Sequence, residues 1–201
     1  MKKLIIDLCA GLGGFSQAFK NDPKYEVITI DIQKKFKPTI IADVCNLPLK
    51  DNLKPLALLA SPDCRFFSLA CTQFPRVGIM KALEMVGACF EAVARLKPKQ
   101  YLIENPRARL RHIIGKPKQT IFYSDYGYKT QKPTDLWGNI FLPMVKHQRR
   151  TINQPNLTSL QRLHLHSYII PKKRSERAKI PLGVSKAVKE GVEYFEEKIY
   201  G

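Results

Sequence analysis

A short apolar run that leads directly into a glycine-rich turn is the feature that most restricts the fold of this chain. Residues Lys3–Leu8 read KLIIDL and are followed by the turn CAGLGG, after which a helix is expected over residues 15–20. An apolar run of this length, bounded by charged and turn residues, predicts a fully buried strand. Glycines between a strand and a helix let backbone N–H groups approach a ligand at the positive helix end, although many α/β proteins have such a turn for packing only.

The same pattern recurs along the chain. We predict further strands at Tyr25–Asp31 and at residues 39–42, 56–60 and 100–103, and a long amphipathic helix at Arg76–Leu96. Strands that alternate with helices favour a mostly parallel, doubly wound α/β sheet. Right-handed crossovers place the carboxyl ends of such strands at one edge, where a ligand binds.

Chemically capable side chains follow four of these strands. Asp31 closes the second strand, Asp43 follows the third, Cys64 lies in the loop SPDC after the fourth, and Glu104 follows the fifth. A carboxylate at the end of the second strand can accept hydrogen bonds from ribose hydroxyls, but an acid there can equally cap a turn or a helix. We expect Cys64 and Glu104 to face a common cleft, because their strands end at the same edge of the sheet.

Clustered positive charge favours a polyanionic partner. The chain has 34 Lys and Arg residues against 17 Asp and Glu, which gives a formal net charge of +17. No acidic residue lies between Glu104 and Asp125 or between Asp135 and Glu176, and both intervals are rich in Lys and Arg. Such clusters gain free energy by releasing counterions from nucleic acid, although a solvated basic face is the alternative.

Length, hydropathy and cysteine content exclude several classes of protein. A chain of 201 residues fits one domain, so residues 1–201 are expected to form a single domain. The longest apolar run, residues 56–60, is far shorter than the roughly 20 residues of a membrane span, so we expect a soluble, cytoplasmic protein without a membrane partner. Five cysteines without C-x-x-C spacing argue against a disulfide framework and a structural zinc site, and no metal site is expected.

Taken together, these motifs resemble those of the cytosine carbon-5 methyltransferases. The resemblance is carried by DLCAGLGGF at residues 7–15, Asp31, Asp43, SPDC at residues 61–64 with Phe67 and Ser68, and ENP at residues 104–106. Residues 178–188, AKIPLGVSKAV, resemble the segment with which this family completes its cofactor pocket before a final helix. The order and spacing cover most of the chain, and the joint match is specific where no single motif would be.

The resemblance implies a Rossmann-like methyltransferase fold with S-adenosylmethionine as the methyl donor. The glycine turn would hold the donor, with Asp31 on its ribose and Asp43 near its adenine. The residues implied for this cofactor site are Asp7, Cys9, Ala10, Gly11, Gly13, Gly14, Phe15, Asp31, Ile32, Asp43, Val44, Ser61 and Pro62.

The resemblance also implies that Cys64 is the nucleophile. Carbon 5 of cytosine is a poor nucleophile, and a thiolate that adds at carbon 6 turns the ring into an enamine able to attack a sulfonium methyl group. Glu104 matches the residue that hydrogen-bonds ring nitrogen 3, with Asn105 beside it, and Arg107 or Arg109 would hold the base oxygen or a phosphate. A target base in a duplex would have to flip out of its stack.

DNA is the expected substrate. The same chemistry on RNA, or a catalytically degenerate fold that only binds nucleic acid, are the alternatives. The residues expected to contact nucleic acid are Arg65, Arg109, Lys129, Lys132, Arg149, Arg150, Lys172, Lys173 and Arg174.

A short basic segment takes the place of a separate recognition domain. Residues 140–175 contain no acid and lie where most members of the family insert a target recognition domain. This brevity implies slight sequence discrimination or a separate recognition subunit, since a basic loop along the phosphates positions a protein without reading bases. Residues 178–199 are expected to form the closing motif and the C-terminal helix.

Two departures from the family pattern concern single residues near the ligands. Asp63 stands where a proline usually precedes the nucleophile, and its charge would raise the pKa of Cys64 unless Arg65 or the loop backbone offsets it. Cys9 stands where a phenylalanine is usual, and Asp31 is shorter than the usual glutamate.

A third departure concerns a whole segment. The family's Gln-x-Arg-x-Arg segment is not recognisable, and residues 123–139 lie in its place. There, Lys129, Lys132 and Trp137 would do similar work on the nucleic-acid backbone, or the segment forms a turn around Pro133.

Overall fold

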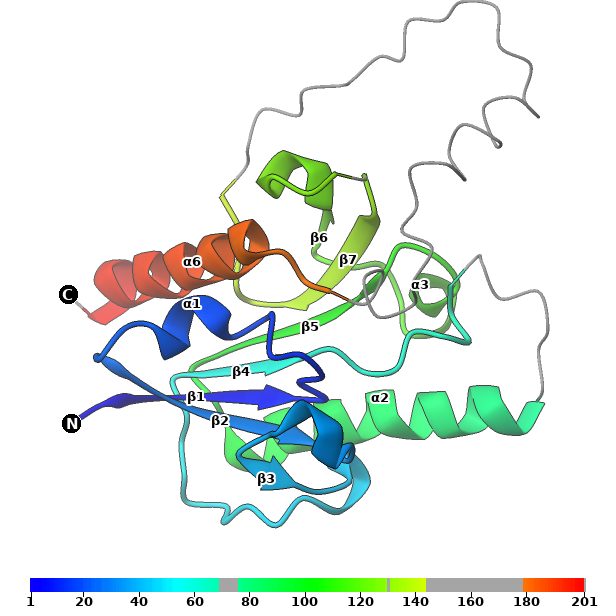
Figure 1. Cartoon of the computed structure of the whole chain (residues 1–201), viewed down its shortest axis with the longest axis horizontal. Coiled ribbons are helices and arrows are strands. Elements are labelled where there is room, and N and C mark those ends of the chain that lie inside the picture. Colours follow the sequence, from blue (N-terminus) through cyan, green and yellow to red (C-terminus); the bar gives the residue numbers. More distant parts are fainter. Residues whose placement is uncertain (69–75, 130, 144–178, 201) are drawn as a thin grey trace, which may run out of the picture.

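One seven-stranded sheet, with the strand order β3-β2-β1-β4-β5-β7-β6, organises the chain (Figure 1). The computed structural model describes residues 1–68, 76–129, 131–143 and 179–200. The strands are β1 (Lys3–Leu8), β2 (Tyr25–Asp31), β3 (Ile40–Ile41), β4 (Ala57–Ala60), β5 (Gln100–Pro106), β6 (Gln119–Phe122) and β7 (Pro133–Gly138). The helices are α1 (Gln17–Lys20), α2 (Arg76–Leu96), α3 (Leu110–Ile113) and α6 (Leu182–Tyr200), with 3-10 turns η1 (Lys34–Phe36), η2 (Val44–Asn46) and η3 (Tyr123–Tyr126).

The first five strands pair in parallel, while β7 runs antiparallel to both of its neighbours. A mostly parallel sheet with helices on both faces is the doubly wound, Rossmann-like α/β fold that the sequence predicts. The fold class is therefore confirmed.

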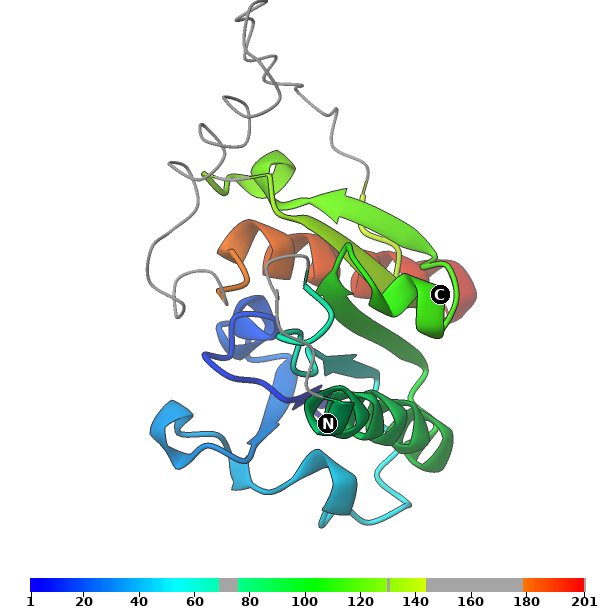
Figure 2. The same ribbon diagram turned by 90° about the vertical axis from the view of Figure 1, so that its right-hand side faces the viewer.

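Helices cover the two faces of the sheet in separate layers. Figures 1 and 2 show α2 on one face and α1 with α6 on the other. Consecutive residues of β1 divide between the two cores, with Ile5 in the core beneath α6 and Ile6 in the core beneath α2. Both faces of the strand are thus buried, which is why its sequence reads as a continuous apolar run.

The predicted elements differ from the observed ones in length. β1, β2 and α2 begin and end where the sequence predicts, but the helix expected at residues 15–20 is only Gln17–Lys20. The fifth strand, predicted to end at residue 103, continues to Pro106, so Glu104 and Asn105 lie within β5 rather than after it. Polar side chains end the apolar run there, but the backbone keeps its pairing with β7.

The segment 123–139, for which a turn around Pro133 was one expectation, is instead mostly ordered structure. It contains η3 and the whole of β7, which pairs with β6 as well as β5. Trp137, expected as a contact to nucleic acid, is only 7% exposed and donates its Nε1–H to Gly115 O at 3.0 Å. That expectation is wrong, because the indole packs inside the protein.

A buried ion pair fastens the antiparallel edge. Asp135, on β7, is fully buried and accepts hydrogen bonds from Arg111 Nε at 2.7 Å and from Thr120 Oγ1 at 2.8 Å. Arg111 belongs to the basic cluster expected to attract nucleic acid, yet its guanidinium is committed to this internal carboxylate.

Within the described ranges, no helix is long and apolar enough to cross a membrane.

Removal of the Asp135 carboxylate should destabilise the fold strongly. Asp135→Ala leaves Arg111 without its partner, and we expect a loss of about 2–4 kcal/mol in the free energy of unfolding measured with urea. Asp51→Ala is the control, because Asp51 is 73% exposed and forms a surface ion pair with Arg95 at 3.3 Å. Its removal should lower the free energy of unfolding by less than about 0.5 kcal/mol. Equal effects of the two substitutions would contradict a structural role for the buried pair.

Candidate active site

The candidate site lies at the carboxyl ends of β1, β4 and β5. β1 pairs with β2 on one side and β4 on the other, so the chain crosses over in opposite directions from this strand. Ligands of doubly wound sheets bind outside the strand ends at such a switch point. The loops after β1 and β4, which carry the motifs, therefore lie on the two sides of this switch point. β5 is the next strand beyond β4.

The glycine-rich turn after β1 is held in a left-handed conformation. Gly11 and Gly13 have φ values of 51° and 69°, which glycine adopts without strain. Gly11 N donates to Asp31 Oδ2 at 2.8 Å, and Asp31 Oδ1 accepts from Gln33 N at 2.8 Å. Asp31 thus lies at the predicted strand end and ties the turn to β2, while its role on a ribose stays a prediction.

The C-terminal segment packs directly on this turn. Ser185, fully buried in α6, donates its hydroxyl hydrogen to Phe15 O at 2.8 Å and accepts from Ala18 N at 2.9 Å. A Cβ atom on Gly14 would lie 2.7 Å from Ile180 O. Glycine is therefore required at residue 14, because the chain before α6 approaches the turn so closely.

Among the buried polar atoms that have no partner within the described residues, two lie at the ends of β1 and β4. Asp7 accepts from Ser16 Oγ at 2.6 Å through Oδ2, but its Oδ1 has no hydrogen-bond donor, and Ser61 Oγ after β4 has no partner. Burial raises the pKa of Asp7 to about 6. An unsatisfied buried group costs roughly 1–3 kcal/mol, so both atoms suit a polar ligand, and Asp7 suits one with a positive charge.

The loop that carries Cys64 is held from β5 and the chain after it. Asn105 Nδ2 donates to Pro62 O at 3.2 Å, and Arg109 Nη1 donates to Ser68 O at 2.8 Å. Asn105 was expected among the catalytic residues and Arg109 as a contact to the base or a phosphate; the structure shows both supporting the loop that carries Cys64, and their expected roles stay predictions. Arg107, also expected there, is exposed, and its backbone N–H donates to Pro133 O at 2.9 Å.

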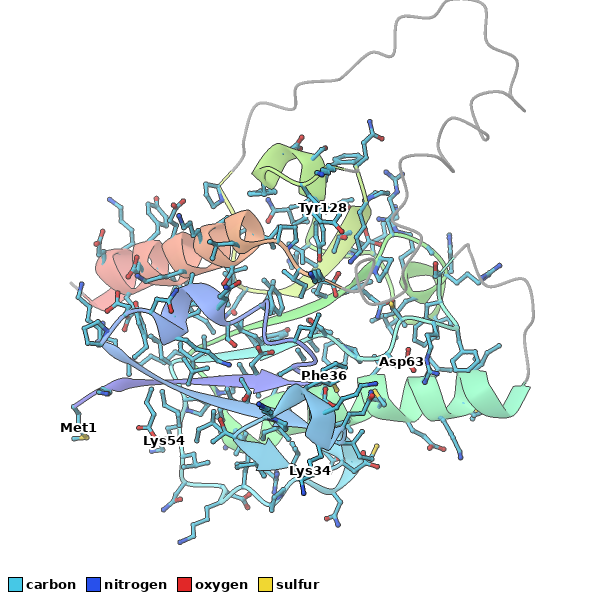
Figure 3. The ribbon with its side chains drawn as sticks, viewed as in Figure 1. Met1, Lys34, Phe36, Lys54, Asp63 and Tyr128 are labelled. Atoms are coloured by element: carbon cyan, nitrogen blue, oxygen red, sulfur yellow. The ribbon has the colours of Figure 1, made fainter. Side chains whose placement is uncertain are left out.

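The negative charge of Asp63 is offset within its own loop. Asp63 accepts from Arg65 Nε at 2.5 Å and from Arg65 N at 3.0 Å. Figure 3 shows Asp63 beside α2, where its backbone N–H donates to Met85 Sδ at 3.3 Å. Arg65, expected to contact nucleic acid, is thus exposed but already paired.

Cys64 is a neutral thiol in the free protein. Burial raises the pKa of Cys64 to about 11, and the charge of Glu104 adds to this effect more than that of Asp63 does. The charge of Lys132 acts in the opposite direction and lowers the pKa. Asp63 is therefore a smaller obstacle to ionisation than the sequence suggested.

Glu104 is buried and oriented by a tyrosine. Its side chain is 6% exposed, and its Oε1 accepts from Tyr123 Oη at 2.9 Å. Burial, followed by the charge of Glu104, raises the pKa of Tyr123 well above its usual value, so the phenol remains a donor. Sequence reasoning missed Tyr123, since its only signal was a place in the segment that lacks the family's arginines.

The other predicted cofactor residues show mixed placement. Asp43 is exposed and caps η2 by accepting from Cys45 N at 3.0 Å, which is the capping role left open as an alternative. Ile32 is 59% exposed and Val44 is buried. Cys9 forms a thiol hydrogen bond with Cys89, which raises the pKa of Cys9 well above its usual value.

Five of the basic residues expected to bind nucleic acid lie outside the described residues: Arg149, Arg150, Lys172, Lys173 and Arg174. Of those inside, Lys129 is exposed, and Lys132 lies with its Nζ 4.5 Å from the centroid of the Tyr123 ring. Most of the proposed basic segment, residues 144–175, is likewise outside the described ranges.

A viral protein resembles this chain along most of its length. The relative, from Frog virus 3 (isolate Goorha) and named "Probable DNA (cytosine-5)-methyltransferase", is 29% identical over 160 residues, covering 69% of this chain and 72% of its own. No protein-family model matches the chain. The relative confirms the resemblance to the cytosine carbon-5 methyltransferases that the motifs predict.

Two solved structures are more distantly similar. One is described as a candidate DNA modification methyltransferase encoded within a prophage of E. coli, with a TM-score of 0.47, 18% identity and coverage of 68% of this chain and 46% of its own. The other, the MccD protein, has a TM-score of 0.31, 19% identity and coverage of 63% and 52%. The chain thus spans about half the length of each.

The buried charge of Asp7 should make the ligand-free protein less stable above pH 6. Because the pKa of Asp7 rises from 3.8 to about 6 on folding, the unfolded chain ionises first, and stability falls as the pH rises through this interval. We expect Asp7→Asn to gain at most about 3 kcal/mol at pH 8 and nothing below about pH 4, by urea unfolding.

A matched control for this prediction is Asp43→Asn, which makes the same change at an exposed carboxylate and keeps a capping oxygen. Its urea midpoint should stay close to that of the unsubstituted protein at both pH values. A loss of stability in Asp7→Asn at pH 8 would mean that the carboxylate is satisfied in the free protein, contrary to the structure.

Proposed function

We propose that the protein transfers a methyl group from S-adenosylmethionine to carbon 5 of cytosine in DNA, through a covalent bond between Cys64 and carbon 6 of the base. The observation that carries this proposal is the meeting of Cys64 and Glu104 at the ends of the adjacent strands β4 and β5. The glycine turn after β1 lies on the other side of β4. A nucleophile, a carboxyl group and a cofactor turn thus share one edge of the sheet.

The chain's own residues fit this methyl donor. S-adenosylmethionine would supply an electrophilic methyl group on a sulfonium, and it carries a further positive charge on its amino group. The unpartnered Oδ1 of Asp7 and the unpartnered hydroxyl of Ser61 are suited to such a ligand. The left-handed turn at Gly11 and Gly13 lies near the same strand ends, and α6 supports that turn through Ser185.

Cys64 would attack carbon 6 as a thiolate, and Glu104 would donate a hydrogen bond to ring nitrogen 3. Addition of the thiolate pushes electrons toward carbon 5, which then accepts the methyl group. Loss of the proton from carbon 5 and departure of the Cys64 thiolate restore the aromatic ring and release the product. A base within duplex DNA would reach this site only after flipping out of its stack.

Binding of the base should itself activate Cys64. When Glu104 donates a hydrogen to the ring it carries a proton and no charge, which removes one of the causes that raise the pKa of Cys64. A bound cytosine would therefore make Cys64 easier to ionise, while burial, the largest cause of its raised pKa, persists.

DNA rather than RNA is proposed as the substrate because the viral relative is named for DNA. We further propose that residues 1–201 form one domain, with residues 178–199 closing the cofactor pocket. The small size of the segment 140–175 would leave sequence recognition weak or dependent on a separate subunit.

A mechanism-based trap tests the chemistry. Incubated with S-adenosylmethionine and DNA that contains 5-fluorocytosine, the protein should form a covalent adduct that survives denaturation, because fluorine cannot leave carbon 5 as a proton does. Cys64→Ala should form none, and Glu104→Gln should react about 100-fold more slowly while binding the cofactor normally. Cys45→Ala, at an exposed cysteine outside the site, is the control and should react normally.

The same trap distinguishes the alternatives. An adduct with RNA but not with DNA would replace the proposed substrate. If neither nucleic acid reacts although the protein is folded and binds S-adenosylmethionine, the protein is a non-catalytic binder and the proposal fails. An adduct that persists in Cys64→Ala would overturn the choice of nucleophile.

A further inference from the structure

Tyr123 connects two charged side chains of the site. The tyrosine is fully buried, and its hydroxyl donates to Glu104 Oε1 at 2.9 Å. The ammonium group of Lys132 lies 4.5 Å from the centroid of the same ring. A cation over an aromatic face is attracted by the ring's electrons. Tyr123 therefore contacts the carboxyl group of Glu104 through its hydroxyl and the ammonium group of Lys132 through its ring.

The backbone fixes Lys132 where it can meet this ring. Lys132 has a φ of 30°, a left-handed conformation that is uncommon for a residue with a side chain. Its carbonyl accepts from Thr134 Oγ1 at 3.1 Å, and the preceding carbonyl, Gln131 O, accepts from Tyr123 N at 2.8 Å. Pro133 O accepts from Arg107 N at 2.9 Å, which joins this corner to the end of β5. The unusual conformation is therefore stabilised from both sides.

The charged and titratable groups around Cys64 come from each element packed against it. They are Asp63 and Arg65 in its own loop, Glu104 on β5, Tyr123 on η3 and Lys132 before β7. Asp63 and Arg65 pair with each other. Glu104 and Lys132 remain as opposed influences, since Glu104 raises the pKa of Cys64 and Lys132 lowers it.

We propose that Lys132, held on the face of Tyr123, supplies the positive charge that stabilises the Cys64 thiolate, and that Tyr123 is its positioning residue. The proposal rests on the function proposed above, because it assigns roles within the same site. Lys132 and Tyr123 belong to residues 123–139, the stretch that stands in place of the family's missing arginines.

Alkylation of Cys64 in the free protein tests the charge of Lys132. The rate of reaction with iodoacetamide follows the thiolate fraction, and mass spectrometry of the Cys64 peptide separates it from the other cysteines. We expect Lys132→Gln to slow this reaction roughly three- to tenfold at about pH 8 and to move the whole pH profile upward. Lys132→Arg should keep the rate near that of the unsubstituted protein.

The matched control is Lys129→Gln, which removes the same charge from an exposed position in the same segment. It should change the alkylation rate by less than about twofold. Equal pH profiles for Lys132→Gln and the unsubstituted protein would overturn the proposal, and so would equal shifts in Lys132→Gln and Lys129→Gln.

A double-substitution cycle tests the positioning role of Tyr123. Tyr123→Leu removes the ring beneath Lys132, so it should move the Cys64 pH profile upward when Lys132 is present and not when residue 132 is glutamine. Equal shifts in both backgrounds would show that Tyr123 acts on Cys64 without Lys132 and would overturn the positioning role. Should Tyr123→Leu fail to fold, the comparison of Lys132→Gln with Lys132→Arg still decides whether Lys132 acts on Cys64.

These experiments need neither cofactor nor DNA. If the alkylation rates do not depend on Lys132, the proposed methyl transfer is unaffected, because the 5-fluorocytosine trap tests it separately. Conversely, suppose that the folded protein shows a Lys132-dependent alkylation profile but forms no adduct with 5-fluorocytosine. The influence of Lys132 on Cys64 would then stand, and the proposed function would be overturned.

Discussion

The parallel pairing of β4 with β5 is the constraint on which the whole site depends. Ala60 lies opposite Ile103 in this pairing, so the loop that begins at Ser61 leaves the sheet beside Glu104 and Asn105. The side-chain amide of Asn105 then fixes the loop by donating to Pro62 O. Cys64, in the loop after β4, and the carboxyl group of Glu104 on β5 are thereby brought together by backbone register.

The sequence was sufficient where one physical signal dominated. Apolar runs that are buried on both faces identified β1 and β4, and β-branched residues identified β2. The glycine turn and the SPDC loop could be placed at the ends of β1 and β4 because parallel strands share an edge. The antiparallel edge could not be predicted in this way. β7 begins with a proline and carries Asp135 at its centre, and only the distant partner Arg111 makes that carboxylate tolerable inside the protein. Tyr123 escaped prediction for the same reason, and Lys132 was expected only as a contact to nucleic acid, since its place beside Tyr123 depends on how the chain enters β7.

The free protein holds its reactive groups in costly or inactive states. Asp7 is buried with one oxygen unpaired, and Cys64 keeps its proton because burial and Glu104 both disfavour the thiolate. Ligands of the chemistry we propose would relieve the first condition through a positively charged cofactor, and would weaken the second through a base that takes a hydrogen bond from Glu104. Stability lost in the empty site is thus regained on binding, which is a common feature of preorganised active sites. Lys132 on Tyr123 moderates the second condition, because it provides a favourable charge before any substrate arrives.

The identity of the methylated nucleoside tests the central claim most directly. The protein would be incubated with duplex DNA and S-adenosylmethionine that carries a labelled methyl group, and the DNA would then be digested to nucleosides and separated. Our account predicts that the label appears in 5-methyldeoxycytidine and that none appears with Cys64→Ala. Label on an exocyclic amino group of cytosine or adenine, or undiminished 5-methyldeoxycytidine with Cys64→Ala, would contradict it.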